Sequence, residues 1–205
     1  MSVAHGSIVF GLILFIALIL SVLVRLPSFS LFSYHPTFMT AFLVCITEGV
    51  ALLQPTPATV ETKQKGFRWH LLVQVLGSGC LLIGFLCIFY NKQLHNKPHF
   101  QSFHGQMGLT IFIYVWLQAI FGVIMALIPR YVFGSVERGK QLWKYHRMTG
   151  YVLLLVVWIT AQLGVRTDYM LANLINTNLL YLHWIVLVLV IAGLFYRFRI
   201  HKIGF

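Results

Sequence analysis

Four histidines have the type and spacing that could do chemistry: His35, His70, His104 and His146. Each lies near the start of a long apolar stretch, and the four stretches follow one another along the chain. A neutral imidazole is a common ligand of transition metals, and it also titrates close to neutral pH. A single histidine in an apolar helix is more often a polar contact between helices. The positions of the segments that carry the four histidines must therefore distinguish metal binding from a structural contact.

The composition places these residues in a membrane. Of 205 residues, 59% are hydrophobic and 9% are charged, whereas a soluble domain has about 25% charged residues. A spanning helix needs about 20 mostly apolar residues. Six stretches meet that condition: residues 7–24, 34–53, 69–90, 103–127, 142–164 and 178–196. The connectors between them are short, so we expect an all-α membrane protein with a single transmembrane domain over residues 1–205.

The first stretch, residues 7–24, could also be read as a cleavable signal peptide. No basic residue precedes it, and Arg25, Leu26 and Pro27 do not form a small-residue cleavage site. We therefore expect it to be retained as the first of six transmembrane helices.

The basic residues predict the orientation. Six spans bring both termini to one side, together with the connectors after the second and fourth spans. Of the fifteen lysines and arginines, all but Arg25, Lys92, Lys97 and Arg166 fall on that side, which includes Arg199 and Lys202. Basic residues favour cytosolic connectors, so both termini are expected in the cytosol, with the protein in the endoplasmic reticulum, in vesicles or in the plasma membrane. The net charge of +11 then belongs to a membrane face, and no nucleic-acid partner is expected.

The histidines alternate between the two faces, because consecutive spans are antiparallel. His35 and His104 are expected near the non-cytosolic face, and His70 and His146 near the cytosolic face, each within about one turn of the start of its helix. Two imidazoles on facing helices fill both axial positions of a haem iron, and bundle cores commonly hold such groups. The pattern therefore predicts two b-type haems inside a central four-helix bundle formed by the second to fifth spans.

Other residues in the spans add weaker signals. Gly108 and Gly150 each follow a histidine by four residues, where a missing side chain would let a flat macrocycle approach the backbone. His183 has no partner at its depth and is expected to be structural. Glu48 is the carboxylate deep in a span, and we expect it to face the bundle, where it accepts a hydrogen bond or helps with proton balance.

Several short segments together resemble the cytochrome b561 family, and most of all its short branch that consists of this domain alone. They are Leu31-Phe32-Ser33-Tyr34-His35-Pro36 with Met39, Thr47-Glu48, Lys65-Gly66 before Trp69-His70, Asn96-Lys97-Pro98-His99-Phe100, His104-Gly105-Gln106-Met107-Gly108, and Tyr145-His146 with Gly150. The resemblance implies a six-helix fold with two haems, whose axial pairs are His35–His104 and His70–His146.

The resemblance also implies a reaction, in which cytosolic ascorbate is oxidised and its electron crosses the membrane to ferric iron or to the monodehydroascorbate radical. It implies a donor site with basic residues near the cytosolic histidines, and Lys65, Arg68 and Lys140 fall in matching places. Such residues attract ascorbate because it is a monoanion. Ascorbate-type members carry a segment rich in Tyr and Arg after the second span, whereas residues 51–55 here read Ala-Leu-Leu-Gln-Pro.

The opposite face is expected to hold the acceptor site. The connector over residues 91–100 carries His95, Lys97 and His99 close to the His35–His104 pair. Basic residues suit an anionic ferric chelate, and a neutral imidazole binds metal directly. The expected partners are therefore membrane lipid, ascorbate, and a ferric chelate or monodehydroascorbate, and a homodimer is compatible with these features.

Three other functions fit part of the pattern. A membrane anchor of a quinol-oxidising dehydrogenase would use the same bis-histidine haems together with a partner subunit. A proton-coupled transporter would use the histidines without haem, but it usually shows broken helices or inverted repeats, and neither is clear here. A structural membrane protein without haem is the third. A visible spectrum separates the first of these from the other two.

Overall fold

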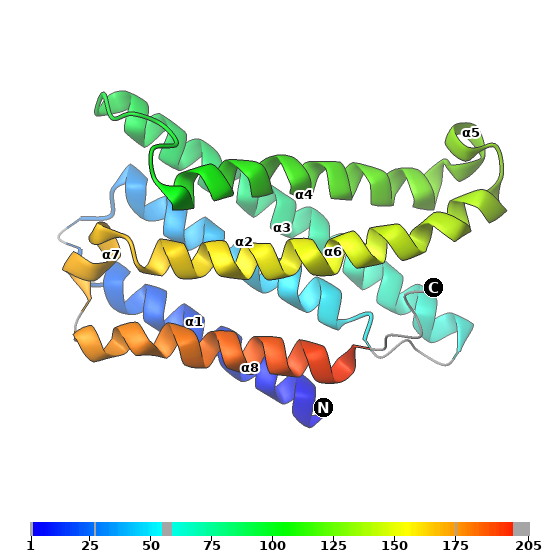
Figure 1. The fold of residues 1–205 in the computed structure, drawn as a ribbon, viewed down its shortest axis with the longest axis horizontal. Coiled ribbons are helices and arrows are strands. Elements are labelled where there is room, and N and C mark those ends of the chain that lie inside the picture. The colour runs from blue at the N-terminus through cyan, green and yellow to red at the C-terminus, as the bar shows by residue number, and fades with distance from the viewer. Residues whose placement is uncertain (1, 27, 55–58, 175, 199–205) are drawn as a thin grey trace.

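The chain folds into a bundle of long helices. The computed structural model describes residues 2–26, 28–54, 59–174 and 176–198, so Arg199 and Lys202 lie outside the described part. The long helices are α1 (Val3–Leu23), α2 (Leu31–Ala51), α3 (Val60–Leu94), α4 (Phe103–Leu127), α6 (Val136–Val165) and α8 (Leu182–Arg197) (Figure 1). Shorter helices are α5 (Pro129–Phe133), α7 (Asp168–Asn173) and the 3-10 helix η1 (Thr177–Tyr181). The expectation of an all-α membrane protein is confirmed.

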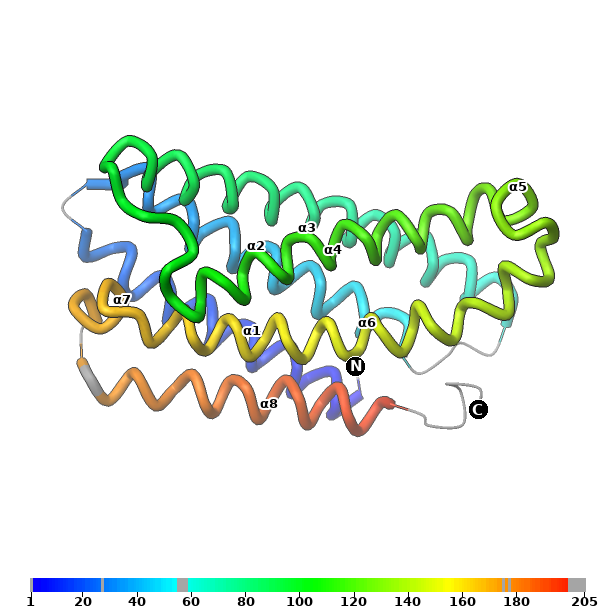
Figure 2. The backbone as a smooth tube through the Cα atoms, turned by 45° about the horizontal axis from the view of Figure 1, so that its top comes forward, coloured from blue at the N-terminus to red at the C-terminus, as the bar shows by residue number. Residues whose placement is uncertain are grey.

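The long helices associate as three pairs. α1 packs against α8, α2 against α3 and α4 against α6, and contacts between the pairs are fewer. All six run along one common direction, with the connections gathered at two ends (Figures 1 and 2). The start of α1, the end of α8 and the short helix α5 share one end (Figure 1), which we call the terminal end. The opposite end carries α7, and we call it the α7 end.

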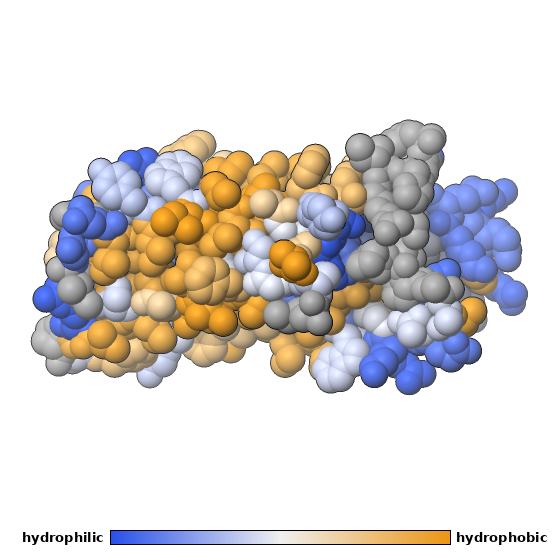
Figure 3. All heavy atoms as spheres, turned by 90° about the horizontal axis from the view of Figure 1, so that it is seen from below, coloured by the Kyte–Doolittle hydropathy of each residue, from blue (hydrophilic) through white to orange (hydrophobic). Residues whose placement is uncertain are grey.

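The surface is that of a membrane protein. Figure 3 shows one face, where hydrophobic residues cover the middle and hydrophilic residues gather toward both ends. In the described part of the chain, five segments are long and apolar enough to cross a membrane: α1, α3, α4, α6 and Asn178–Arg197. The last segment consists of most of η1 together with α8. α2 has 21 residues, as α1 does, but it is more polar. Two of its polar side chains, Ser33 and Thr47, are fully buried, so they face protein and not lipid.

Two helices begin six or more residues earlier than the hydropathy predicts. α3 begins at Val60, well before the predicted residue 69, and α6 begins at Val136, before the predicted residue 142. Local capping explains the difference. The Thr59 side chain accepts a hydrogen bond from the Thr62 amide, and the Ser135 side chain accepts one from the Arg138 amide. These bonds satisfy amide groups that would otherwise lack a partner, and an acidic residue in each first turn favours the helix dipole.

The early starts correct one detail of the histidine positions. His35 and His104 lie in the first turns of α2 and α4, as expected, but His70 and His146 each lie ten residues beyond the first residue of α3 and α6. The basic connectors before them are therefore largely helical, so helical turns continue past the apolar stretch at the terminal end.

A very close helix contact joins α8 to the start of α1. A Cβ atom on Gly193 would lie 2.6 Å from the carbonyl oxygen of Ala4 and 2.6 Å from Cγ1 of Ile8. Small residues at such contacts let helix backbones approach closely in membranes.

We expect Gly193→Ala to lower the melting temperature of the detergent-purified protein, because the backbone of α1 must move away and overpacking costs about 1–3 kcal/mol. Gly66→Ala is the matched control, since its Cβ would meet Leu53 at an ordinary 3.6 Å. Thermal unfolding followed by intrinsic fluorescence measures both variants. Equal melting temperatures would contradict the close packing of α1 on α8.

Candidate functional site

His35 and His104 face each other across the space between α2 and α4. Their ring centroids lie 6.3 Å apart, with an angle of 79° between the ring planes. A bond from a metal to an imidazole nitrogen is about 2 Å long. A ring centre lies about 1 Å behind its nitrogen, so two imidazoles on opposite sides of one ion have centres about 6 Å apart. The observed separation therefore fits two axial ligands of one iron.

Each pair of predicted histidines lines a cavity. His35 and His104 line one of about 320 Å³ at the α7 end, and His70 and His146 line one of about 750 Å³ toward the terminal end. Both volumes fall in the range of small-molecule and cofactor sites, and apolar side chains dominate both linings. Within the described residues, no three His, Cys, Asp or Glu side chains gather around one point. The histidines therefore come as pairs, which suits the two axial positions of a haem.

Backbone carbonyl groups fix the orientation of three of the four rings. Nδ1 of His35 donates to the Gly84 carbonyl at 3.0 Å, and Nδ1 of His70 donates to the Gly49 carbonyl at 2.7 Å. Nδ1 of His104 donates to the Thr160 carbonyl at 3.0 Å. A ring that holds its proton on Nδ1 presents the lone pair of Nε2, the form that a metal ligand requires.

The bonds of α2 and α3 are reciprocal. His35 of α2 bonds to Gly84 of α3, and His70 of α3 bonds to Gly49 of α2. In each helix the glycine follows the histidine by fourteen residues. Because the two helices are antiparallel neighbours, equal spacing places each histidine beside the glycine of the other helix.

α4 and α6 also pair a histidine with a glycine of the other helix, at a longer spacing and through close contact with the ring instead of a hydrogen bond. A Cβ on Gly164 of α6 would lie 2.9 Å from Cε1 of His104, and one on Gly122 of α4 would lie 2.8 Å from Cε1 of His146. Each glycine follows the histidine of its own helix by eighteen residues. The two glycines therefore make room for the rings. The sequence analysis missed all four glycines, although the repeated spacings were present in the sequence.

The ring of His146 is positioned by packing against neighbouring side chains, without a hydrogen bond at Nδ1. Its ring centroid lies 5.8 Å from that of Trp143 and 6.1 Å from that of Phe121, while Gly122 leaves space beneath it. Its Nδ1 is buried without a hydrogen-bond partner. The two glycines that the sequence singled out also line the cavities: Gly108 faces open space in the first, and Gly150 lies against Gln118 in the second.

The structure separates the basic residues of the terminal end into two groups. Lys65, Arg68 and Lys140, which the sequence predicts at the donor site, are exposed and do not line the cavity of His70 and His146. The bases that line it are Lys63, Arg147 and Arg197. Spacing along α3 and α6 did not distinguish between these groups, because the difference depends on which side of each helix faces the cavity.

Of the predicted acceptor residues at the α7 end, one lines the cavity and two do not. His99 lines the cavity of His35 and His104, together with Lys92, and its ring stacks on Phe89 with centroids 4.3 Å apart. Nε2 of His99 is buried without a partner. His95 and Lys97 are exposed and do not line this cavity, and Nδ1 of His95 donates to the Asn91 carbonyl at 2.7 Å.

The fold and the paired histidines define an integral membrane helix bundle with two cavities, each lined by a pair of histidines. A family model described as eukaryotic cytochrome b561 matches residues 34–171, a segment that contains all four histidines. The chain therefore belongs to the cytochrome b561 family, whose members bind haem b. His5, His183 and Arg197 lie outside the matched segment.

Curated relatives agree with this assignment. The chain is 30% identical over 167 residues to the Bos taurus protein "Transmembrane reductase CYB561D2", covering 78% of this chain and 70% of the relative. It is 31% identical over 155 residues to the Homo sapiens protein of the same name, covering 73% of this chain and 65% of the relative. It is 25% identical over 136 residues to the Xenopus laevis "Plasma membrane ascorbate-dependent reductase CYBRD1", covering 65% of this chain and 47% of the relative. The chain thus spans less than two thirds of the length of the human and frog relatives.

The glycines predict site-specific effects on haem binding. A methyl group at Gly164 would displace the His104 ring, and one at Gly122 would displace the His146 ring. We therefore expect Gly164→Ala and Gly122→Ala each to remove or shift one spectral component of the bound haem, and to affect different components. Reduced-minus-oxidised spectra of the purified variants measure this, with Gly66→Ala as the control. Loss of the same component in both variants would contradict the assignment of the glycines to separate sites.

Proposed function

We propose that this protein carries electrons across a membrane through two b-type haems, one held by His35 and His104 and the other by His70 and His146. The observation that carries the proposal is the facing pair His35–His104, at the separation that two axial ligands need. The cavity of His70 and His146 toward the other end supports a second site. A haem with two imidazole ligands changes oxidation state by one electron and is closed to oxygen.

We propose six membrane spans, with α2 as the span that composition alone does not select. α2 is as long as α1 and packs between α1 and α3. Its polar side chains Ser33 and Thr47 are buried in the protein, where they need not be solvated by lipid. Six spans would also explain why α1 begins and α8 ends at the same end (Figure 1).

The distance between the two sites suits direct electron transfer. Gly49 accepts the bond from His70 and lies fourteen residues after His35 on the same helix. At 1.5 Å of rise per residue, the two sites differ in depth by about 21 Å, and the edges of two macrocycles would lie much closer than their centres. The residues of this chain orient the rings and exclude water, and no further carrier is needed between the sites.

Ascorbate is the proposed electron donor, at the terminal end. Lys63, Arg147 and Arg197 line the cavity there, and Lys65, Arg68 and Lys140 add positive charge outside it. This charge would attract ascorbate, a monoanion. The frog relative is named an ascorbate-dependent reductase, which supports this donor. The excess of bases at the terminal end supports a cytosolic position for that end.

The proposed acceptor is a ferric chelate or monodehydroascorbate at the α7 end. Lys92 and His99 line the cavity of the His35–His104 site, and Lys97 and His95 lie exposed nearby. A base attracts an anionic acceptor, and the buried Nε2 of His99 has a free hydrogen-bonding position. His99 is therefore the acceptor-side residue that the geometry favours over His95 and Lys97.

The haem assignment is tested by deleting one ligand at a time. We expect two haems per chain by the pyridine haemochrome assay. His35→Ala and His104→Ala should remove the same spectral component, and His70→Ala and His146→Ala the other, because each pair shares one iron. A stoichiometry of one haem, or two members of a pair that remove different components, would overturn the arrangement.

The acceptor side is tested in proteoliposomes that contain ascorbate and expose the α7 end outward. We expect His99→Ala to slow the reduction of external ferric chelate by about tenfold, because a metal-binding side chain is lost beside the exit site. Haem reduction by internal ascorbate should not change. His95→Ala is the matched control, since that ring is exposed and bonds only to its own helix. Equal rates in the two variants would remove His99 from the acceptor site.

A further inference from the structure

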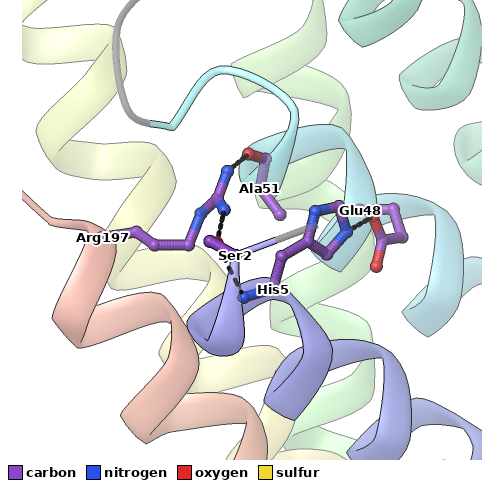
Figure 4. A network of polar contacts seen from close by, with 5 residues as sticks. All are labelled: Ser2, His5, Glu48, Ala51 and Arg197. Atoms are coloured by element: carbon purple, nitrogen blue, oxygen red, sulfur yellow. Dashed lines mark hydrogen bonds and ion pairs between the residues drawn. The ribbon is translucent and has the colours of Figure 1, made fainter.

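A histidine–carboxylate pair at the terminal end joins α1 to α2. Nε2 of His5 lies 3.0 Å from Oε2 of Glu48 (Figure 4). The chain has four acidic residues, and the other three, Glu61, Glu137 and Asp168, stand in the first turns of α3, α6 and α7. Those three positions are favourable for acidic side chains because of the helix dipole. Glu48, near the end of α2, has no such explanation.

The pair is partly buried and its hydrogen bonding is incomplete. The side chains of His5 and Glu48 are 23% and 24% exposed. Oε1 of Glu48 is buried without a hydrogen-bond partner, which costs free energy for a carboxylate. The exposed part of His5 keeps the pair in reach of water. A group of this kind exchanges protons with one side of the membrane while its charge acts on the protein interior.

Arg197 of α8 completes the cluster. Its guanidinium donates to the Ser2 hydroxyl and to the Ala51 carbonyl, both at 2.9 Å (Figure 4). The same Ser2 hydroxyl accepts a bond from the His5 backbone amide. The start of α1 and the ends of α2 and α8 are therefore tied together, and Arg197 also lines the cavity of His70 and His146.

The cluster is connected to the His70–His146 site through the backbone next to Glu48. Gly49, which follows Glu48, accepts the hydrogen bond from Nδ1 of His70. On the α6 side, Gln54 of the connector after α2 donates to the Tyr151 hydroxyl, and both residues line the same cavity. The remaining charged groups of that lining are Lys63 of α3 and Arg147 of α6. In this poorly solvated region, a change of one charge in the cavity acts strongly on the protonation of a nearby group.

We propose that His5 and Glu48 form a proton-accepting pair, which takes up one proton from water when an electron reaches the His70–His146 site. This inference rests on the proposed function, because it requires a haem at that site. Before the electron arrives, the pair holds a neutral His5 and an ionised Glu48. A haem held by His70 and His146 would supply the site that accepts one electron, and the ring of His5 then gains one proton at Nδ1. No other bond forms or breaks, and the added negative charge is compensated locally.

The proposal predicts that the potential of one haem depends on pH. The reduced state binds more protons, so the potential falls as pH rises. Full coupling of one proton to one electron corresponds to about 59 mV for each tenfold change in proton concentration. The haem of the His35–His104 site, at the opposite end of the bundle, should respond less.

The test is a spectroelectrochemical titration of the full chain in detergent, between about pH 5 and 8, where histidine titrates. His104→Ala provides the background, because it retains the haem of the His70–His146 site alone. Glu48→Gln and His5→Gln are added one at a time. Glu61→Gln is the matched control, an exposed carboxylate in the first turn of α3. The electrode supplies the electron, so the result does not depend on ascorbate as the donor.

We expect the background protein and the Glu61→Gln control to share the same pH slope, and either pair variant to lose at least half of it. A pH indicator in unbuffered solution should show a matching loss of proton uptake on reduction by dithionite. His5→Gln lies in the first turn of α1 and retains a polar side chain, so it serves if Glu48→Gln fails to fold. A slope that persists in the folded pair variants, or a background potential independent of pH, overturns the inference alone. A protein that binds no haem overturns the proposed function as well.

Discussion

A neutral imidazole buried among apolar helices has one donor and one acceptor, and each needs a partner. In this bundle the donor of three rings bonds to a carbonyl of the neighbouring helix: Gly84 for His35, Gly49 for His70 and Thr160 for His104. The acceptor nitrogen is then available to a second partner, which we propose is a haem iron. This requirement fixes where the histidine-bearing helices can lie relative to one another, and the rest of the site depends on it.

Antiparallel packing satisfies this requirement for both rings of α2 and α3, whereas in α4 and α6 the donor of His104 bonds to Thr160 and the donor of His146 has no partner. α2 and α3 each carry a histidine and a glycine fourteen residues apart, and α4 and α6 repeat the pattern with eighteen residues. In α2 and α3 the glycine offers its carbonyl to the histidine of the other helix, and in α4 and α6 the glycine leaves space for the ring of the other helix. The two pairs contact each other less than their own members do, and the cavities occupy the space between them.

The charges follow the same division into two ends. The terminal end concentrates the bases and holds the pair His5–Glu48 beside Arg197, whereas the α7 end brings Lys92 and His99 to its cavity. An electron that moves between the ends changes the charge balance in a medium that solvates charge poorly. In the proposed function, groups that exchange protons or attract anions at each end would compensate this change of charge.

The sequence by itself determined the helical membrane class, the four histidines, their alternation between two ends and the family to which the chain belongs. These follow from properties of single segments: apolar length, residue type and the direction of each helix. Only the tertiary structure decided that Gly49, Gly84, Gly122 and Gly164 receive the rings, and that Lys63, Arg147 and Arg197 line the cavity in place of Lys65, Arg68 and Lys140. It also joined His5 to Glu48, 43 residues apart in the chain. Position along a helix sets depth in the bundle, but the side that faces a neighbour depends on how all the helices pack together.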